Sequence, residues 1–93
     1  MELKVFTLPT CSICSLAEKI ILEVADKCQI GCRIVDMATE EGLREGLAHK
    51  VASVPSIAID EDVIARGRLI SGDQLRREVQ RRLEYIRPLD GSR

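Results

Sequence analysis

A chain of 93 residues, 45% of them hydrophobic, can form one domain with an aliphatic core and is too short for two. Fourteen basic and fifteen acidic residues give a net charge of −1, and only 2% of the residues are aromatic, which argues against nucleic acid and anionic membranes as partners. The sequence has no apolar run of membrane-spanning length and no signal-peptide pattern at its start, so it predicts a cytoplasmic protein.

Hydrophobic periodicity, together with glycine, proline and capping residues, predicts seven elements in the order β-α-β-α-β-β-α. The predicted elements are a strand at 3–8, a helix at 12–28, a strand at 32–36, a helix that begins after Thr39, strands at 56–60 and 63–66, and a helix that begins at 71–73. A strand–helix–strand opening predicts a parallel pair, and the closing hairpin adds an antiparallel edge. We therefore expect an α/β domain at 1–87 with a four-stranded mixed sheet and helices on both faces, and a polar tail at 88–93.

The middle helix has the weakest pattern of the three. Its apolar stripe is predicted to be Leu43 and Leu47, with Val51 as a further candidate. We interpret the two glycines at Gly42 and Gly46 as a sign of loose packing or fraying, with a packing interface as the alternative. His49, the only histidine, is expected at the surface near the end of this helix.

The last helix is predicted to be amphipathic. Its apolar stripe is formed by Leu75, Val79, Leu83 and Ile86. Its other side carries four arginines, which we interpret as a solvated face, with an acidic partner protein as the alternative. These arginines are Arg76, Arg77, Arg81 and Arg82.

Two cysteines, Cys11 and Cys14, stand where the first strand passes into the first helix. Loops at the carboxyl ends of strands are the usual ligand-binding edge of an α/β sheet, and a helix start supplies unpaired N–H groups and a partial positive charge. Cys11, predicted at or next to the N-cap, is therefore expected to have a lowered pKa and to act as a nucleophile. Cys14 lies one turn further into the helix, where it can resolve a mixed disulfide.

The remaining cysteines, Cys28 and Cys32, allow two interpretations. A zinc site that joins them to the first pair is disfavoured, because Cys28 would lie about 25 Å along one helix from Cys11. We expect both to be buried core thiols, and a second redox pair across the turn at Gly31 stays open as the alternative.

Three segments resemble the redoxins of the thioredoxin superfamily. Residues 7–14 resemble the glutaredoxin active-site segment Pro-[Ser/Thr]-Cys-x-x-Cys, residues 53–57 resemble the Thr-Val-Pro segment of glutaredoxins and thioredoxins, and residues 69–73 resemble the Gly-Gly-x-Asp stretch of glutaredoxins. The chain is similar to small glutaredoxin-like redoxins over about residues 3–86. This resemblance implies a thioredoxin fold and a cis peptide bond before Pro55.

In such redoxins an extended substrate pairs with the backbone beside the cis-proline, and the resemblance implies the same at Val54. The substrate contacts that it implies are Thr10, Ser12, Ile13, Val54, Pro55, Gly72 and Asp73. No metal or cofactor is implied beyond the redox-active Cys11–Cys14 disulfide, with glutathione as a co-substrate in the glutaredoxin-like alternative.

The sequence departs from glutaredoxins at the positions that bind glutathione. Leu8 stands where they usually carry a lysine, Ile13 replaces a common aromatic residue, and Ser71 replaces the first glycine of the Gly-Gly pair. We therefore predict a monomeric dithiol–disulfide oxidoreductase that reduces protein disulfides, with a thioredoxin-reductase-type or glutathione electron donor. The alternatives are a glutathione-dependent glutaredoxin and, because Ser12 follows the first cysteine, a [2Fe–2S] carrier.

Overall fold

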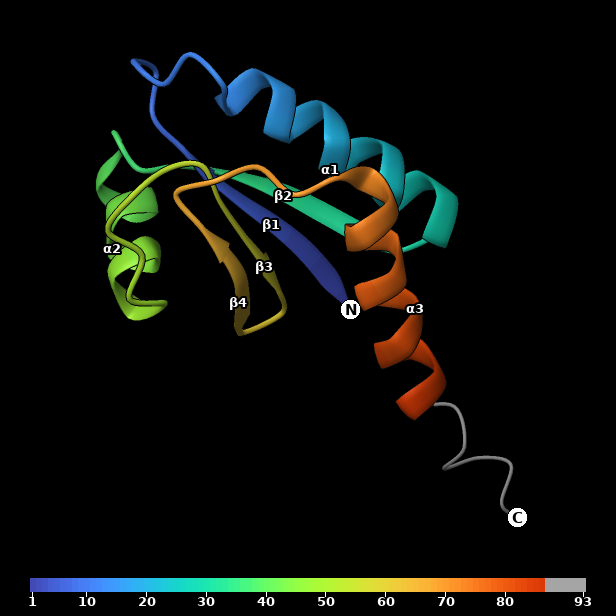
Figure 1. Cartoon of the computed structure of the whole chain (residues 1–93). Coiled ribbons are helices and arrows are strands. Elements are labelled where there is room, and N and C mark those ends of the chain that lie inside the picture. The colour runs from blue at the N-terminus through green and yellow to red at the C-terminus, as the bar shows by residue number, and fades with distance from the viewer. Residues whose placement is uncertain (87–93) are drawn as a thin grey trace.

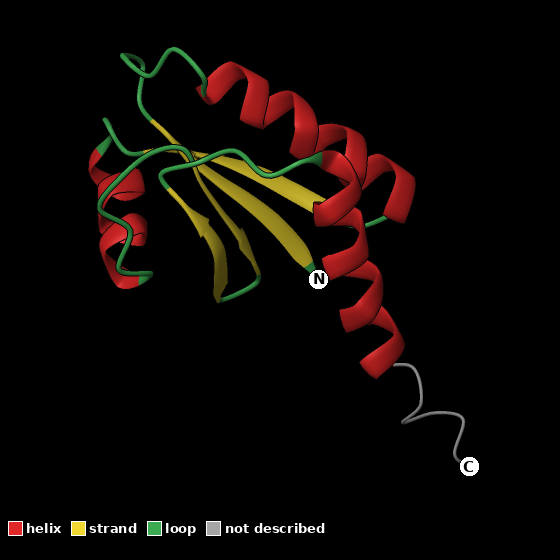
Figure 2. Ribbon diagram, in the orientation of Figure 1, coloured by secondary structure: helices red, strands yellow, loops and turns green. Residues whose placement is uncertain are grey.

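The predicted order of elements is confirmed by the computed structural model, which describes residues 1–86 (Figure 1, Figure 2). The elements are β1 (Glu2–Thr7), α1 (Cys14–Cys28), β2 (Gly31–Asp36), α2 (Glu40–Ala48), β3 (Ser56–Ile59), β4 (Asp62–Arg66) and α3 (Gly72–Ile86). The strands form one sheet in the order β2-β1-β3-β4, in which β1 and β2 are parallel and the other neighbours antiparallel. The proposed domain end at 87 and the tail at 88–93 lie outside the described residues.

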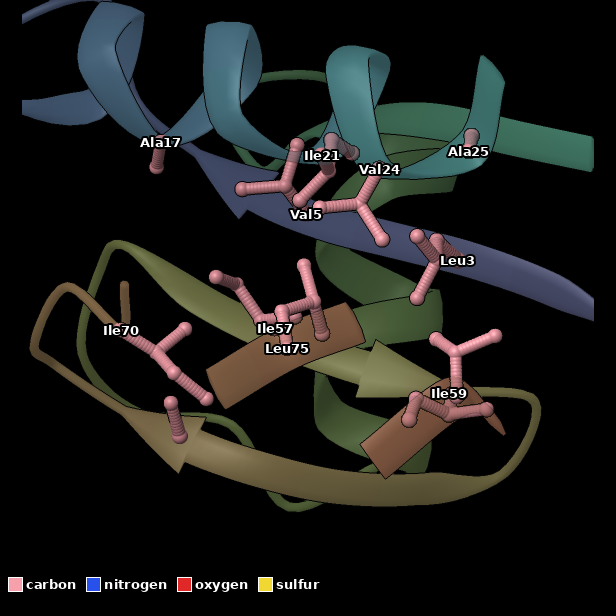
Figure 3. Close-up of a cluster of buried hydrophobic side chains, with 12 residues drawn as sticks. Leu3, Val5, Ala17, Ile21, Val24, Ala25, Ile57, Ile59, Ile70 and Leu75 are labelled. Atoms are coloured by element: carbon pink, nitrogen blue, oxygen red, sulfur yellow. The ribbon is translucent and has the colours of Figure 1, made fainter. Parts of the chain in front are cut away.

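Alternate residues of the central strands face two separate hydrophobic clusters. Leu3 and Val5 of β1 point toward α1 and α3, and Phe6 points to the opposite face, on which α2 lies. Figure 3 shows side chains of α1, such as Ile21, directed at β1 and β3, with α2 behind the sheet. Period-two alternation in β1 thus places helices on both faces, as the sequence predicts. None of the helices described is long and apolar enough to cross a bilayer.

The inward face of α2 is made of glycines, and the predicted leucine stripe is wrong. Leu43 and Leu47 are 45% and 63% exposed, whereas Gly42 and Gly46 are buried. A Cβ on Gly42 would overlap the carbonyl oxygen of Asp36, and one on Gly46 would lie 2.7 Å from the Cε of Met37. The two glycines are therefore a close packing interface, because only a residue without a side chain allows the helix to approach the end of β2 so closely.

A cluster of charged groups lies between α2 and the sheet, and it includes His49. The expectation of a surface histidine is wrong, because this side chain is only 5% exposed. Its Nδ1 lies 3.0 Å from the carbonyl oxygen of Glu45, which can only accept, so Nδ1 carries the hydrogen. The Nε2 atom is then free to accept from the Lys4 ammonium at 3.4 Å, and Glu61 lies 3.3 Å away. Burial is possible because each polar atom of the ring has a partner.

Glu45 connects this cluster to Arg33 on β2, the outer strand of the sheet on that side. Both of its oxygens accept from Arg33, at 2.8 and 2.6 Å, and Lys4 lies 3.3 Å away. Hydrogen bonding from Arg33, opposed in part by burial and assisted by Lys4, lowers the pKa of Glu45 to about 2. The charged form is therefore favoured in the folded state.

The pH dependence of the free energy of unfolding should reflect the ionisation of the Glu45 carboxylate. Because the folded pKa lies below the unfolded value of about 4.3, the stabilisation is complete above that value and is lost as the pH falls towards 2. We expect Glu45→Gln to lower the free energy of unfolding at pH 7, and the gap from wild type to narrow by pH 3 in urea titrations followed by circular dichroism. The control is Glu40→Gln, whose pair with Arg44 at 3.4 Å is exposed on both sides and should contribute little. A gap that stays constant down to pH 3 would contradict this assignment.

Candidate redox site

Two loops meet at one edge of the sheet. In the strand registers, Phe6 at the end of β1 is opposite Ser56 at the start of β3, and Thr7 is opposite Asp36 at the end of β2. The loop that follows β1 and the turn that precedes β3 therefore lie at the same edge, next to the start of α1 (Figure 1). Two of the three predicted motifs, the cysteine pair and the Val54–Pro55 segment, are in these two loops.

Cys11 and Cys14 form a disulfide, with their Cα atoms 5.4 Å apart. Cys11 is half-buried and Cys14 is 3% exposed. The first sulfur is thus the one that a partner can reach, and the second is held in the interior one turn away. This difference in exposure matches the predicted roles of attacking and resolving thiol.

The first helix begins two residues later than predicted. It starts at Cys14, with Ile13 as the N-cap, and residues 8–11 form a turn in which the Cys11 N–H donates to the Leu8 carbonyl at 3.1 Å. The prediction of Ser12 as the start failed because an apolar repeat does not specify where the first turn closes. No described side chain caps this helix, so the N–H groups of its first turn remain available to a thiolate in the cysteine loop.

The turn before β3 contains the expected cis bond between Val54 and Pro55. Its polar groups are bound by the loop that follows β4: the Arg68 N–H donates to the Pro55 carbonyl at 3.1 Å. The Gly67 N–H donates to the Ser56 hydroxyl at 3.3 Å, and that hydroxyl donates to the Ser53 carbonyl at 2.7 Å.

Towards the residues described, Val54 leaves both of its backbone polar groups free. Among the hydrogen bonds of the residues described, none uses its N–H or its carbonyl oxygen. The residue is half-buried, and it lies at the same edge as the cysteine loop. It therefore offers one free donor and one free acceptor to a chain bound there in an extended conformation.

Apolar and small polar side chains surround the cysteines. Thr10 and Ser12 are exposed, and Ile13 and Leu16 are exposed although they are large hydrophobic residues. Leu16 was not among the predicted contacts, because helical spacing alone does not show which residues face a partner. Exposed apolar side chains beside a reactive sulfur are suited to contact with another protein.

Gly72 and Asp73 lie in the first turn of α3. A Cβ on Gly72 would lie 4.0 Å from a methyl group of Val24, and Asp73 is exposed and pairs with Arg76 at 3.6 Å. Val24 follows Cys14 by ten residues in α1, which corresponds to about 15 Å along the helix axis. Gly72 therefore packs against a later turn of α1 than the one that holds Cys14, and the substrate contacts predicted for Gly72 and Asp73 stay predictions.

The other two cysteines are free thiols packed against the core. Cys28 and Cys32 are half-buried beside the cluster between the sheet and α1. Burial, with a further contribution from the negative charge of Glu2, raises the pKa of Cys32. A raised pKa disfavours the reactive thiolate, which agrees with the interpretation as a core thiol.

Comparison with known proteins gives the following relatives. Residues 1–80 match a family model described as a thioredoxin domain. The "Probable Thioredoxin" of Archaeoglobus fulgidus is 33% identical over 85 residues, covering 89% of this chain and 93% of its own. Thioredoxin 1 of Thermosipho africanus has a TM-score of 0.75 at 24% identity, covering 94% of this chain and 99% of its own. Thioredoxin-2 of the malaria parasite secretion machinery has a TM-score of 0.70 at 18% identity, covering 86% and 81%. These two structures support the fold alone.

Proposed function

Because the chain belongs to the thioredoxin domain family, we propose that it reduces disulfide bonds in other proteins, with Cys11 as the attacking thiolate and Cys14 as the resolving thiol. The resemblance to redoxins of the thioredoxin superfamily is confirmed by the family match and by the fold. The observation that carries the proposal is the pairing of a reachable Cys11 with a buried Cys14 at the sheet edge that also holds Val54.

The reaction is a two-electron exchange. The Cys11 thiolate attacks one sulfur of the substrate disulfide, which forms a mixed disulfide and releases the other substrate sulfur as a thiolate that takes up a proton. The Cys14 thiolate then attacks the Cys11 sulfur and releases the second substrate thiol. The substrate has gained two electrons and two protons, and the protein is left with the Cys11–Cys14 disulfide that the structure contains.

Groups of the protein itself assist these two reaction steps. The uncapped N–H groups of α1 stabilise negative charge in the cysteine loop, and so favour the thiolate of Cys11. Val54 holds the substrate chain in an extended conformation while Ile13 contacts its apolar side chains. We propose that a thioredoxin-reductase-type donor restores the dithiol and that the protein works as a monomer in the cytoplasm, where a dithiol is kept reduced.

Glutathione dependence is the alternative, and one pair of assays separates the two donors. The first assay follows turnover of a small glutathionylated disulfide coupled to glutathione reductase; the second follows insulin reduction by dithiothreitol. We expect insulin reduction that requires both cysteines and little glutathione turnover, because Leu8 supplies no positive charge where glutaredoxins usually carry a lysine. Fast glutathione turnover that persists in Cys14→Ser would instead identify a glutaredoxin. A brown protein after anaerobic purification would favour the [2Fe–2S] carrier.

A further inference from the structure

The loop after β4 places two arginines beside the substrate-pairing turn. Arg66 is opposite Ser56 in the β3–β4 register, and the Arg68 backbone donates to the Pro55 carbonyl at 3.1 Å. Gly67, between them, adopts a φ of +68°, and a Cβ there would lie 2.6 Å from the Ser53 hydroxyl oxygen. The segment 66–68 is thus held tightly against the turn that contains Val54.

These two arginines differ from most others in the structure. Within the described side chains, neither Arg66 nor Arg68 has a carboxylate within 4.0 Å, and both residues are exposed. Arg66 makes only a long hydrogen bond, of 3.4 Å, to the carbonyl oxygen of His49. The arginines that do pair with a carboxylate are Arg33, Arg44, Arg76, Arg81 and Arg82.

The distribution of arginines without a carboxylate partner differs from the one that their density in the sequence suggests. Three of the four arginines on α3 are neutralised by neighbouring acids, so their face is a solvated one. Arg66 and Arg68, by contrast, place positive charge without a carboxylate partner among the described side chains at the end of β4, next to the backbone groups that a substrate chain would use. A free cation at the rim of a binding edge contributes mainly to the rate and selectivity of association.

Acidic groups at the same sheet edge do not cancel this charge. Glu40 and Glu41 begin α2 after the end of β2, and β2 is two strands away from β3, which is about 10 Å. That separation is about one Debye length at physiological ionic strength, whereas β4 is the direct neighbour of β3.

We propose that the disulfide partners of this protein carry acidic residues next to the reactive cysteine, and that Arg66 and Arg68 select them. This inference rests on the proposed function, since it assigns the substrate class of the same site. The reaction is unchanged: the Cys11 thiolate attacks the substrate sulfur, and the arginines raise the rate at which acidic chains reach Val54.

The test uses three peptides of equal length, each with one cysteine flanked by Glu, Gln or Lys and joined to the same thionitrobenzoate leaving group. Prereduced protein attacks the peptide sulfur, because thionitrobenzoate is the better leaving thiol, and its release is followed by stopped-flow absorbance. At low ionic strength we expect the Glu peptide to react about tenfold faster than the Lys peptide. Salt at 0.5 M should reduce that ratio to about threefold or less.

The variants localise the effect. Arg68→Gln, and more fully Arg66→Gln combined with Arg68→Gln, should bring the Glu-to-Lys ratio to within about twofold. The matched control is Arg77→Gln, an arginine on α3 that also has no carboxylate partner among the described side chains; it should keep the wild-type ratio. Circular dichroism establishes that each variant is folded.

The outcomes are distinct. Equal rates for the Glu and Lys peptides in wild type, or a ratio that survives in the double variant, would overturn the proposal. A Gln peptide that reacts normally in either case leaves the proposed function intact. A Gln peptide that does not react with the reduced protein at all would instead overturn the proposed function.

Discussion

Replacement of either active cysteine should separate the two halves of the reaction. We expect Cys11→Ser to lower insulin reduction by at least about a thousandfold, because the attacking thiolate is gone. We expect Cys14→Ser to accumulate as a mixed disulfide with its substrate, because the attack through Cys11 still occurs and nothing resolves its product. Intact-protein mass spectrometry measures the trapped adduct directly.

The control for these variants is Cys28→Ser. Cys28 is a free, half-buried thiol at the end of α1, outside the cysteine loop, so this variant should keep wild-type turnover and should trap nothing. The assignment of Cys11 as the attacking sulfur would be refuted by substantial turnover in Cys11→Ser, or by a mixed disulfide between Cys11→Ser and its substrate.

The glycine face of α2 should be the most sensitive packing site outside the core. In Gly42→Ala the new methyl group meets the backbone carbonyl of Asp36 and lies 2.9 Å from the Thr39 hydroxyl oxygen, so the helix must shift. Overpacking of this kind costs about 1–3 kcal/mol or more, and the better helix propensity of alanine recovers at most about 1 kcal/mol. We expect a net loss of about 2 kcal/mol in urea unfolding.

Gly31→Ala provides the comparison for the same chemical change. A Cβ at Gly31 has no atom within 4 Å, so this variant should change the free energy of unfolding by less than about 0.5 kcal/mol. If Gly42→Ala is as stable as Gly31→Ala, the close approach of α2 to the end of β2 is not present in solution.

The cysteine and proline motifs could be located from the sequence because they depend on local order along the chain. Cys11 and Cys14 follow a strand and precede a helix, and Val54–Pro55 precedes another strand. Once the strands pair as predicted, the register between β1 and β3 necessarily brings both motifs to the same edge. The same reasoning placed the helices on the two faces of the sheet.

The errors arise where packing between elements overrides local pattern. The stripe through Leu43 and Leu47 is a genuine helical repeat, but the sheet accepts the glycine face because its backbone can approach more closely. His49 was expected at the surface because its partners, the buried Lys4 and the exposed Glu61, come from other segments of the chain. The sequence around His49 therefore gives no indication of this cluster.

Gly72 and Asp73 illustrate a different limit. Their motif resembles a known subsite and Gly72 packs against Val24 of α1, but a role in substrate contact depends on the bound substrate and stays a prediction. The role of Arg68 was missed because its contact with the Pro55 carbonyl uses a backbone N–H, which no side-chain pattern reveals. A glycine at the end of a strand, such as Gly67, is the one signal that could have drawn attention to this loop.

The hydrogen bonds of the proline turn also restrict which disulfides can be reduced. Because Arg68 and Gly67 already bind the Pro55 carbonyl and the Ser56 hydroxyl, a target chain in the proposed reaction would align its backbone at Val54. The target must therefore present a stretch with a free N–H and a free carbonyl near its cysteine. If the protein reduces disulfides as proposed, those inside helices, or with proline at the aligning position, would first require local unfolding of the target, and its rate would then report how accessible and extended the target's backbone is.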